Sequence, residues 1–573
     1  MIDNRLTCDY LVVGAGTACL SFVDVVLARR KEATFVIVDR LSAPGGHWTM
    51  AYPYVRLHQP SAYYGVNSLP LSKTDKKGNE PFDQNIRASA KEICDYYRKV
   101  VDNFEATGRV KTYFETNYEG EARDENEKRN VDSNSYSDPK AKITHIITTK
   151  DGETIFVDCT KVVRCESNVV VPSMRDSLPF PIDDSAEWVN PNKLPDILGS
   201  NLLHNNYLVV GGGKTGVDAV IYLLKSGKVT HDQITWIVPR PSWYFVSTYL
   251  QSKDRPGKLF WKDAVENILK PLLNANSSKE AFLNMEKRGV TQRVDPNDGH
   301  FPLIFKGATV SQDDMDNLRK IRNIVKLKGR VTSITDREVI FANGAHSIPF
   351  SPSNTLVIDC TVEETYGYMK FGEDFQFFNP HKIRLGPFTS MFNPSHTCAQ
   401  VGFLESVYCD TAAGDEMKNS FLFFPPWISQ GRDDNFLAYF LLSFYAQQRT
   451  DFAFEKCPDY QKWVLKARTD RNLPGHHGGI LGLVWAVLGP VKLLKTAIVF
   501  GKKLENGAYE DLSSPMFTRP GPDGSKHKAN LRYPPTPKKE KQKAKRAARS
   551  LASNRQQQQV GVEQHSGVRE TIT

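Results

Sequence analysis

Two segments of the chain repeat one order of apolar and polar positions. Each begins with a short apolar run, continues through a glycine-rich turn into a stretch of helical period, and ends in a second apolar run. In the N-terminal segment, residues 10–16 read YLVVGAG, residues 20–30 predict a helix, and residues 33–39 predict a second buried strand. A buried strand, a helix and a second buried strand together predict a βαβ unit.

Glycines and an acid in this first unit stand where a dinucleotide would bind. Gly14 and Gly16 form a G-x-G pair at the end of the first strand, and Asp39 ends the second strand, 25 positions after Gly14. Glycines let the backbone approach a pyrophosphate, the helix N-terminus offers N–H groups to it, and the acid binds ribose hydroxyls. The third glycine position holds Cys19, which is small enough to let helix and strand pack. We expect all four residues at a cofactor site.

The second unit carries a complete glycine fingerprint. A strand at residues 207–210 leads into Gly211, Gly213 and Gly216 at G-x-G-x-x-G spacing, followed by a helix that begins near Lys214 and Thr215. The next strand, ITWIVPR, ends in Arg240 and not in an acid. An arginine there can form charge-assisted bonds with a 2′-phosphate, which favours NADPH over NADH. Lys214 and Thr215 are further candidate phosphate contacts. The alternative is that Arg240 is a solvated residue at a strand end.

Two dinucleotide units, the first ending in an acid and the second in an arginine, predict FAD in the first and NADPH in the second. The expected fold class is therefore α/β, with two Rossmann-like domains, the NADP domain inserted into a discontinuous FAD domain. A strand at residues 355–361 is expected to return the chain to the FAD domain. The predicted ranges are FAD domain 1–175 and 355–430, NADP domain 200–350, a helical region with an apolar segment 431–505, and a mostly disordered basic tail 506–573.

The segment 45–65, GGHWTMAYPYVRLHQPSAYYG, has neither helical nor strand period and predicts a loop. It follows the acid of the first unit, so it leads toward the flavin end of the cofactor. Gly45 and Gly46 would let the backbone pass the pyrophosphate. The aromatic residues, Trp48 among them, would wall in the isoalloxazine ring.

Two fingerprints with GGHW after the first resemble the flavin-containing and Baeyer–Villiger monooxygenases. Those enzymes carry a GG-x-W element and then a YPG-x-R-x-D-like stretch beside the flavin, which Tyr52, Pro53 and Arg56 resemble here; His58 stands in place of the acid. The resemblance implies an FAD-dependent, NADPH-using monooxygenase that acts on a small organic substrate with molecular oxygen. It implies that Arg56 supplies positive charge near the reacting oxygen. His58 would hydrogen-bond the flavin or move a proton, or else only pack against the ring.

The family's F-x-G-x-x-x-H-x-x-x-W/S signature between the two units is missing from residues 191–216. Up to about residue 426 the chain is more similar to a group of FAD/NAD(P)-binding oxidoreductases related to that superfamily, through YPYVRLHQPSAYYGVNSLPL, GGGKTGVDA, WIVPRPSWY and VIDCT. Two alternatives therefore stay open. One is an NADPH-dependent flavin reductase or oxidase without oxygen transfer, and the other is a binding protein that flavin only stabilises.

Composition narrows the class and the compartment. A chain of 573 residues with 40% hydrophobic residues predicts two or three globular domains. Nine cysteines include no C-x-x-C pair, which argues against a metal site and a dithiol redox centre and fits a reducing compartment. The N-terminus lacks the pattern of a secretory signal, so we expect a cytoplasmic protein.

Two segments of the C-terminal region allow several interpretations each. The apolar segment 478–503 is expected to pack over the substrate entrance, to lie at a membrane interface as a peripheral contact, or to span a bilayer. Residues 538–549 hold seven Lys/Arg and one Glu, which leaves about +3 of the +9 net charge for the rest of the chain. This tail predicts a solvated disordered segment, a nuclear-import signal or a tether to an anionic surface. No specific nucleic-acid binding is expected.

Overall fold

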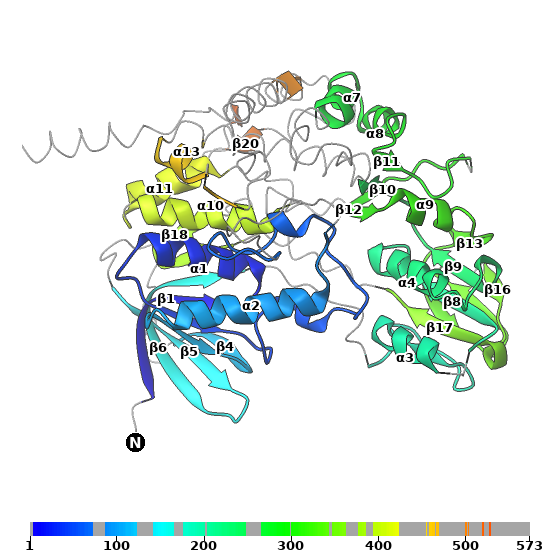
Figure 1. The fold of residues 1–573 in the computed structure, drawn as a ribbon, viewed down its shortest axis with the longest axis horizontal. Helices are drawn as coiled ribbons and strands as arrows, with labels where there is room; N and C mark the ends of the chain where they lie inside the picture. Colours follow the sequence, from blue (N-terminus) through cyan, green and yellow to red (C-terminus); the bar gives the residue numbers. More distant parts are fainter. Residues whose placement is uncertain are drawn as a thin grey trace, which may run out of the picture.

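The computed structural model describes two α/β units that lie beside each other (Figure 1). The described residues are 4–72, 86–122, 141–165, 176–200, 203–247, 265–297, 299–342, 346–361, 376–385, 393–408 and 410–422, with short pieces between 454 and 528.

The first unit is built on a sheet of order β18-β19-β6-β1-β2-β3, which β5 and β4 extend from β6. Strands β19, β6, β1, β2 and β3 run parallel, and β4, β5 and β6 form an antiparallel meander. Its elements are β1 (Arg5–Val13), α1 (Thr17–Arg29), β2 (Phe35–Val38), α2 (Ala90–Glu105), β3 (Val110–Tyr113), β4 (Thr116–Glu121), β5 (Ile143–Thr149), β6 (Thr154–Arg164), β18 (Phe378–Asn379), β19 (Lys382–Arg384), α10 (Pro394–Val407) and α11 (Ala412–Phe421).

Helices α1, α2 and α10 bury one face of this sheet. Apolar residues of α1 pack against α10, and α2 presents its apolar stripe, including Ile93, Tyr97 and Val100, to the same core. Strand β19 pairs with β6 in this sheet, and helices α10 and α11 pack in its core, although all three come from beyond residue 375. The first unit is therefore discontinuous in sequence, as predicted.

The second unit has an all-parallel sheet of order β13-β9-β8-β17-β7. Helices α3, α4 and α9 cover one face of it, and the small sheet β14-β15-β16 covers the other. Its elements are β7 (Trp188–Val189), α3 (Leu194–Gly199), β8 (Asn206–Val210), α4 (Lys214–Lys225), β9 (Ile234–Val238), α9 (Gln312–Leu318), β13 (Asn323–Lys326), β14 (Val331–Ile334), β15 (Glu338–Phe341), β16 (Ser347–Pro349) and β17 (Thr355–Asp359).

The strand β17 corrects one sequence prediction. It does not return the chain to the first unit, because it pairs in parallel with β8 along its whole length and is buried at all five positions. The strands of the second sheet therefore come from a stretch of sequence that begins with β7, before residue 200, and ends with β17, after residue 350. A strand buried on both faces carries no signal for the sheet that it joins, which is why the boundary at residue 355 was wrong.

A third group of elements lies above the second unit in Figure 1. It consists of the sheet β11-β10-β12 and two helices, with bounds β10 (Ser242–Val246), α7 (Lys270–Leu273), α8 (Ser278–Glu286), β11 (Thr291–Gln292) and β12 (Ile304–Val310). From the C-terminal region the structure describes α13 (Pro458–Val464), the hairpin β20 (Thr518–Pro520) and β21 (Lys526–Lys528), and single residues near them.

A cluster of six charged side chains is buried where the C-terminal part of the first unit meets its N-terminal part. Glu405 on α10 accepts from Lys161 on β6 at 2.9 Å, from Lys418 on α11 at 2.7 Å and from the Tyr10 hydroxyl on β1 at 2.9 Å. The remaining members, Arg30, Asp410 and Asp415, pair with them, which balances three cations by three anions. Lys161, Glu405 and Lys418 are each no more than 1% exposed.

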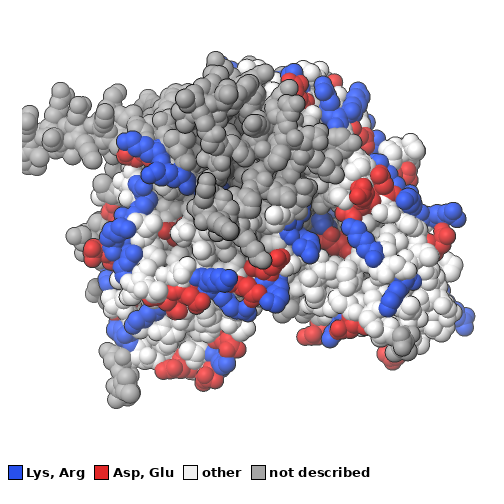
Figure 2. Space-filling model, in the orientation of Figure 1, with Lys and Arg blue, Asp and Glu red and all other residues white. Residues whose placement is uncertain are grey.

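No helix within the described ranges is long and apolar enough to cross a bilayer. Most of the segment 478–503 and almost all of the basic tail lie outside the described residues, so the predictions made for them stay predictions. On the face drawn in Figure 2, Lys and Arg side chains are interspersed with Asp and Glu over both units.

Candidate functional site

The first glycine fingerprint is held by backbone contacts with the loop 45–65. The Gly45 N–H donates to the Ala15 carbonyl at 2.9 Å. A Cβ built on Gly46 would lie 3.0 Å from the Gly16 Cα, so a side chain at residue 46 would crowd the fingerprint. The predicted glycines Gly14, Gly16, Gly45 and Gly46 are thus brought together at the N-terminus of α1.

Asp39 lies at the end of β2, beside this fingerprint, and is 8% exposed. Its Oδ2 accepts the Ala15 N–H at 2.6 Å, and its Oδ1 accepts the Leu41 N–H at 2.9 Å. A carboxylate has about four acceptor positions, so each oxygen keeps one for a ribose hydroxyl. The acid therefore fixes the glycine turn and is still suited to bind a ribose.

Both fingerprint helices begin without a side-chain cap. Helix α1 follows Gly16 and α4 follows Gly213, and neither N-cap residue has a side chain to accept from the helix N–H groups. Five other described helices are capped, by Ser89 (α2), Ser277 (α8), Ser311 (α9), Asn393 (α10) and Thr411 (α11). The N-termini of α1 and α4 therefore present N–H groups and positive helix-dipole ends without a competing side chain, as an anion site requires.

The second fingerprint assigns a separate task to each of two glycines. A Cβ on Gly213 would meet no atom within 4 Å, so open space lies at the start of α4 where a pyrophosphate would approach. A Cβ on Gly216 would lie 2.0 Å from the Gly211 carbonyl oxygen, which also accepts from Trp236 Nε1 at 2.9 Å. Gly216 therefore lets α4 pack against the turn, and the residues fit a dinucleotide.

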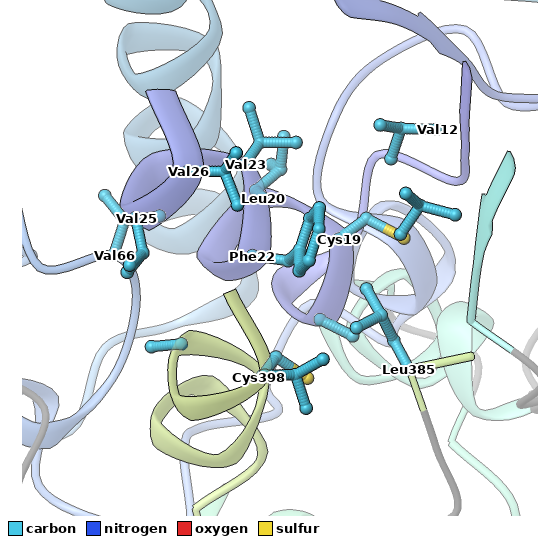
Figure 3. Packing of buried hydrophobic residues seen from close by; sticks show 14 of the residues in the cluster. Val12, Cys19, Leu20, Phe22, Val23, Val25, Val26, Val66, Leu385 and Cys398 are labelled. Carbon is cyan, nitrogen blue, oxygen red and sulfur yellow. The ribbon is translucent and has the colours of Figure 1, made fainter. Parts of the chain in front are cut away.

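Cys19 lies in the first turns of α1 and packs in the core that α1 shares with β1 and α10. Figure 3 shows it among Phe22, Leu385 and Cys398. It is 1% exposed, its Sγ lies 3.5 Å from the Val13 carbonyl oxygen, and burial raises the pKa of its thiol well above the usual value. A protonated, buried thiol is suited to packing and not to nucleophilic chemistry.

Trp48 connects the loop to the N-terminus of α1. Its Nε1 donates to the Tyr64 hydroxyl at 2.6 Å, and Tyr64 and Tyr97 both hydrogen-bond Thr17 Oγ1, the latter at 2.7 Å. Thr17 is the first residue of α1. The aromatic residues of the loop are thus anchored beside the first fingerprint.

Arg468, from the C-terminal region, holds the end of the loop. Its guanidinium donates to the carbonyls of Ala62 at 2.9 Å and Val66 at 3.0 and 3.1 Å, and also to that of Tyr64. One side chain therefore satisfies three carbonyls of an irregular segment, which fixes the backbone around Tyr64.

The middle of the loop docks on the helix of the second fingerprint. The Tyr52 hydroxyl donates to Asp218 Oδ2 on α4 at 2.6 Å, while Asp218 Oδ1 pairs with Lys214. The Tyr54 ring stacks on Tyr222 with centroids 4.0 Å apart and an interplanar angle of 12°. Burial, and then Asp218, raise the pKa of Tyr52 far above its usual value, so it acts as a hydrogen-bond donor. The loop thus touches both fingerprint helices.

Arg56 and His58, predicted as catalytic, lie on the same loop. The Arg56 side chain is exposed and donates to the Arg87 carbonyl at 3.0 Å. The His58 side chain reaches solvent on one side. Desolvation by the protein around the ring lowers its pKa to about 3, Lys214 and Arg87 lower this pKa further, and Asp218 opposes the shift. His58 is therefore neutral at pH 7 and lies in the field of the Lys214–Asp218 pair.

The other predicted nucleotide contacts follow the carboxyl ends of the strands β8 and β9 of the second sheet. Lys214 and Thr215 are the first residues of α4, and Lys214 is paired with Asp218. Arg240 is exposed two residues beyond the end of β9. Within the described ranges, no three His, Cys, Asp or Glu side chains gather as metal ligands would.

Sequence reasoning missed Asp218 and Arg468. Asp218 had a signal, since an acid four residues after Lys214 on a predicted helix forms an i,i+4 pair. Arg468 had none, because it lies 402 positions from Val66, whose carbonyl it binds.

No protein-family model matches the chain. It is similar to uncharacterized proteins of Mycobacterium bovis and Mycobacterium tuberculosis, with 36% identity over 366 residues. The match covers 62% of this chain and 60% of each relative, so the chain spans about three fifths of the length of these relatives.

The solved structures that the chain resembles are flavin monooxygenases. A cyclohexanone monooxygenase from Rhodococcus sp. Phi1 bound to NADP+ is 13% identical with a TM-score of 0.44, covering 73% of this chain and 89% of that one. A flavin-containing monooxygenase from Stenotrophomonas maltophilia is 12% identical with a TM-score of 0.38, covering 70% and 98%. At these identities and scores, no activity, cofactor or substrate is carried over to this chain.

Proposed function

We propose that the chain is an FAD-dependent oxidoreductase that takes electrons from NADPH and acts as a monooxygenase on a small organic substrate. The observation that supports this most directly is that one loop contacts the first fingerprint and the helix that follows the second. Gly46 lies against Gly16 of the first, and Tyr52 donates to Asp218 on the helix of the second. Two nucleotides bound at those helix N-termini would each lie beside this loop.

In this proposal the first unit holds FAD. The N-terminus of α1, after Gly14 and Gly16, would bind the pyrophosphate, and Asp39 would bind the adenosine ribose. The loop 45–65, tied down through Trp48, would lead to the flavin ring.

The second unit would hold NADPH. The N-terminus of α4, after Gly211, Gly213 and Gly216, would bind the pyrophosphate in the open space at Gly213. Lys214, Thr215 and the exposed Arg240 would supply further phosphate contacts, Arg240 to the 2′-phosphate.

A bound flavin would supply the redox chemistry, as an acceptor of hydride from the nicotinamide and a donor of electrons to oxygen. The chain's own task is to position the two nucleotides and to supply charge and proton transfer. His58, whose pKa is lowered, is neutral at pH 7 and would accept a hydrogen bond at one ring nitrogen and donate one at the other. Arg56 would supply positive charge to a reacting oxygen if its side chain turns from the Arg87 carbonyl.

A second function has specific support. The monooxygenase signature between the two units is missing, and the Arg56 guanidinium donates to a backbone carbonyl at the surface. Both observations favour an NADPH-dependent flavin reductase or oxidase that releases peroxide and transfers no oxygen.

The test begins with the purified full-length protein. We expect it to be yellow and to release FAD on denaturation. Anaerobic NADPH should bleach the flavin faster than NADH does. After air is admitted, the yield of hydrogen peroxide per NADPH is measured with and without a panel of small ketones, sulfides and amines.

The outcomes separate the monooxygenase from the reductase or oxidase, and both from a protein without this redox activity. A substrate that lowers the peroxide yield and gains one oxygen atom supports the monooxygenase. Stoichiometric peroxide with every compound supports the reductase or oxidase. A colourless protein, or a flavin that NADPH does not reduce, contradicts both.

A further inference from the structure

Three side chains on one face of α4 contact or flank the loop 45–65. Lys214, Asp218 and Tyr222 follow one another at four-residue spacing, which places them in a row along the helix. Asp218 contacts Tyr52 and Tyr222 contacts Tyr54, so the loop lies along this row. Lys214 ends the row at the N-terminus of α4, where the fingerprint would bind phosphate.

Asp218 divides its two oxygens between the two units. Oδ1 pairs with Lys214 of its own helix, and Oδ2 accepts from Tyr52 of the first unit's loop. The Lys214 and Asp218 side chains are 22% and 18% exposed, so solvent screens their attraction only in part. Lys214 lies beside the Gly213 opening, so a phosphate bound there would share its ammonium with Asp218 and weaken the Lys214–Asp218 pair.

We propose that Asp218 and Tyr52 are positioning residues that couple nicotinamide-nucleotide binding at α4 to the placement of the loop 45–65. The inference rests on the proposed function. A nucleotide phosphate draws the Lys214 ammonium toward itself and weakens its pair with Asp218. A carboxylate that a cation neutralises less is a stronger acceptor, so Asp218 binds the Tyr52 hydroxyl more strongly. Nucleotide binding thereby tightens the loop on α4, and by reciprocity the docked loop favours nucleotide binding.

The proposal predicts opposite effects for two conservative variants. Asp218→Asn releases Lys214 from its anionic partner, while the amide oxygen still accepts from the Tyr52 hydroxyl, so the freed cation dominates and NADP+ should bind on the order of five-fold more tightly. Tyr52→Phe removes the contact with the loop and leaves Lys214 as the sole described partner of Asp218, so NADP+ should bind several-fold more weakly. Both variants should lower the rate of flavin reduction at saturating NADPH, because Asp218→Asn weakens the Tyr52 hydrogen bond and Tyr52→Phe removes it.

The experiment uses the full-length, flavin-loaded protein. Calorimetric titration with NADP+ gives the dissociation constant without turnover, and anaerobic stopped flow gives the limiting rate of flavin reduction. Tyr207→Phe is the matched control, since it removes a buried hydroxyl that has no partner in the described structure, at the amino end of β8. It should leave both quantities unchanged. Lys214→Gln should cancel the gain in affinity that Asp218→Asn produces.

A purely structural role for Asp218 predicts weaker NADP+ binding in Asp218→Asn, and that result would overturn the proposal. Wild-type values in both Asp218→Asn and Tyr52→Phe would overturn it as well while leaving the proposed function intact. If the wild-type protein binds no NADP+, or NADPH does not reduce its flavin, the proposed function fails first and the coupling fails with it.

Discussion

Glu405→Gln removes one charge from the buried cluster that joins the two sequence-distant parts of the first unit. The substitution keeps the shape of the side chain but leaves Lys161 and Lys418 facing an amide in place of a carboxylate. Their ammonium groups lie 2.9 and 2.7 Å from the Glu405 oxygens and are at most 1% exposed. The cluster then carries one uncompensated positive charge, and the buried Lys161 and Lys418 keep only Asp410 and Asp415 as acidic partners.

Removing one partner of a buried ion pair costs about 3 to 5 kcal/mol, because the remaining charge loses its compensation but stays desolvated. For a unit of 150 to 250 residues, this corresponds to a fall in Tm of roughly 6 to 20 °C. Glu115→Gln is the matched control. It breaks the Glu115–Lys150 pair, which has a similar distance of 2.6 Å but side chains 43% and 59% exposed. An exposed pair contributes about 0 to 1 kcal/mol.

Urea unfolding followed by near-ultraviolet circular dichroism measures both losses. A second variant separates charge from packing: Glu405→Gln with Lys161→Met restores the balance between cations and anions, and should be more stable than Glu405→Gln alone. If Glu405→Gln is no more destabilising than Glu115→Gln, or if Lys161→Met worsens it, the explanation by uncompensated charge is wrong.

The same cluster sets a direction for the effect of pH. The cations around Glu405 and Asp410 hold the pKa of both carboxyl groups below the usual range against the opposing effect of burial. Groups with a lowered folded pKa stabilise the protein above their unfolded pKa of about 4, and this stability is lost as the pH falls below it. The fall in the free energy of unfolding between neutral and acidic pH should therefore be smaller in Glu405→Gln than in the wild type. The same fall in both proteins would contradict this assignment.

Three further predictions concern the nucleotide sites. Arg240→Ala should raise the KM for NADPH much more than the KM for NADH, because the lost charge-assisted contact contributes about 1.5 to 3 kcal/mol to binding. Equal effects on both nucleotides would show that Arg240 does not bind the 2′-phosphate. Gly14→Val should abolish FAD retention, since φ of +108° strains any side chain there, while Cys19→Gly should keep the flavin after dialysis; flavin loss from Cys19→Gly would show that the first fingerprint is misread. His58→Ala should change the flavin absorption spectrum or its reduction rate with FAD still bound, and an unchanged spectrum and rate would leave His58 a packing residue.

The sequence predicted both βαβ units because their strands are continuous apolar runs and their turns are glycine-rich. It misassigned the strand β17, since a strand buried on both faces has no alternation of apolar and polar positions that would indicate which sheet it joins. Strand β1 also begins at Arg5, earlier than the apolar run, because β6 pairs with its exposed first residues.

For the candidate site, the glycine motifs located the turns: a Cβ on Gly46 would lie 3.0 Å from the Gly16 Cα, one on Gly216 would lie 2.0 Å from the Gly211 carbonyl oxygen, and one on Gly213 would meet no atom within 4 Å. Their contacts with a cofactor stay predictions. The contacts that bring the loop 45–65 to the second unit were not predictable. Tyr52 and Asp218 are 166 positions apart, and a single sequence contains no information on which tyrosine of an irregular loop meets which acid of a helix.

The discontinuity of the first unit has a consequence for synthesis on the ribosome. Lys161 precedes Glu405 by 244 positions, which at about 5 to 20 residues per second is roughly 10 to 50 s of translation. During that interval β6 has no β19 along its outer edge, and the Lys161 ammonium has no Glu405. The elements of the second unit, from β7 to β17, are all made within the same interval. The inserted domain can therefore finish folding before its host, and the host waits with an open sheet edge, the state in which nascent chains aggregate or need a chaperone.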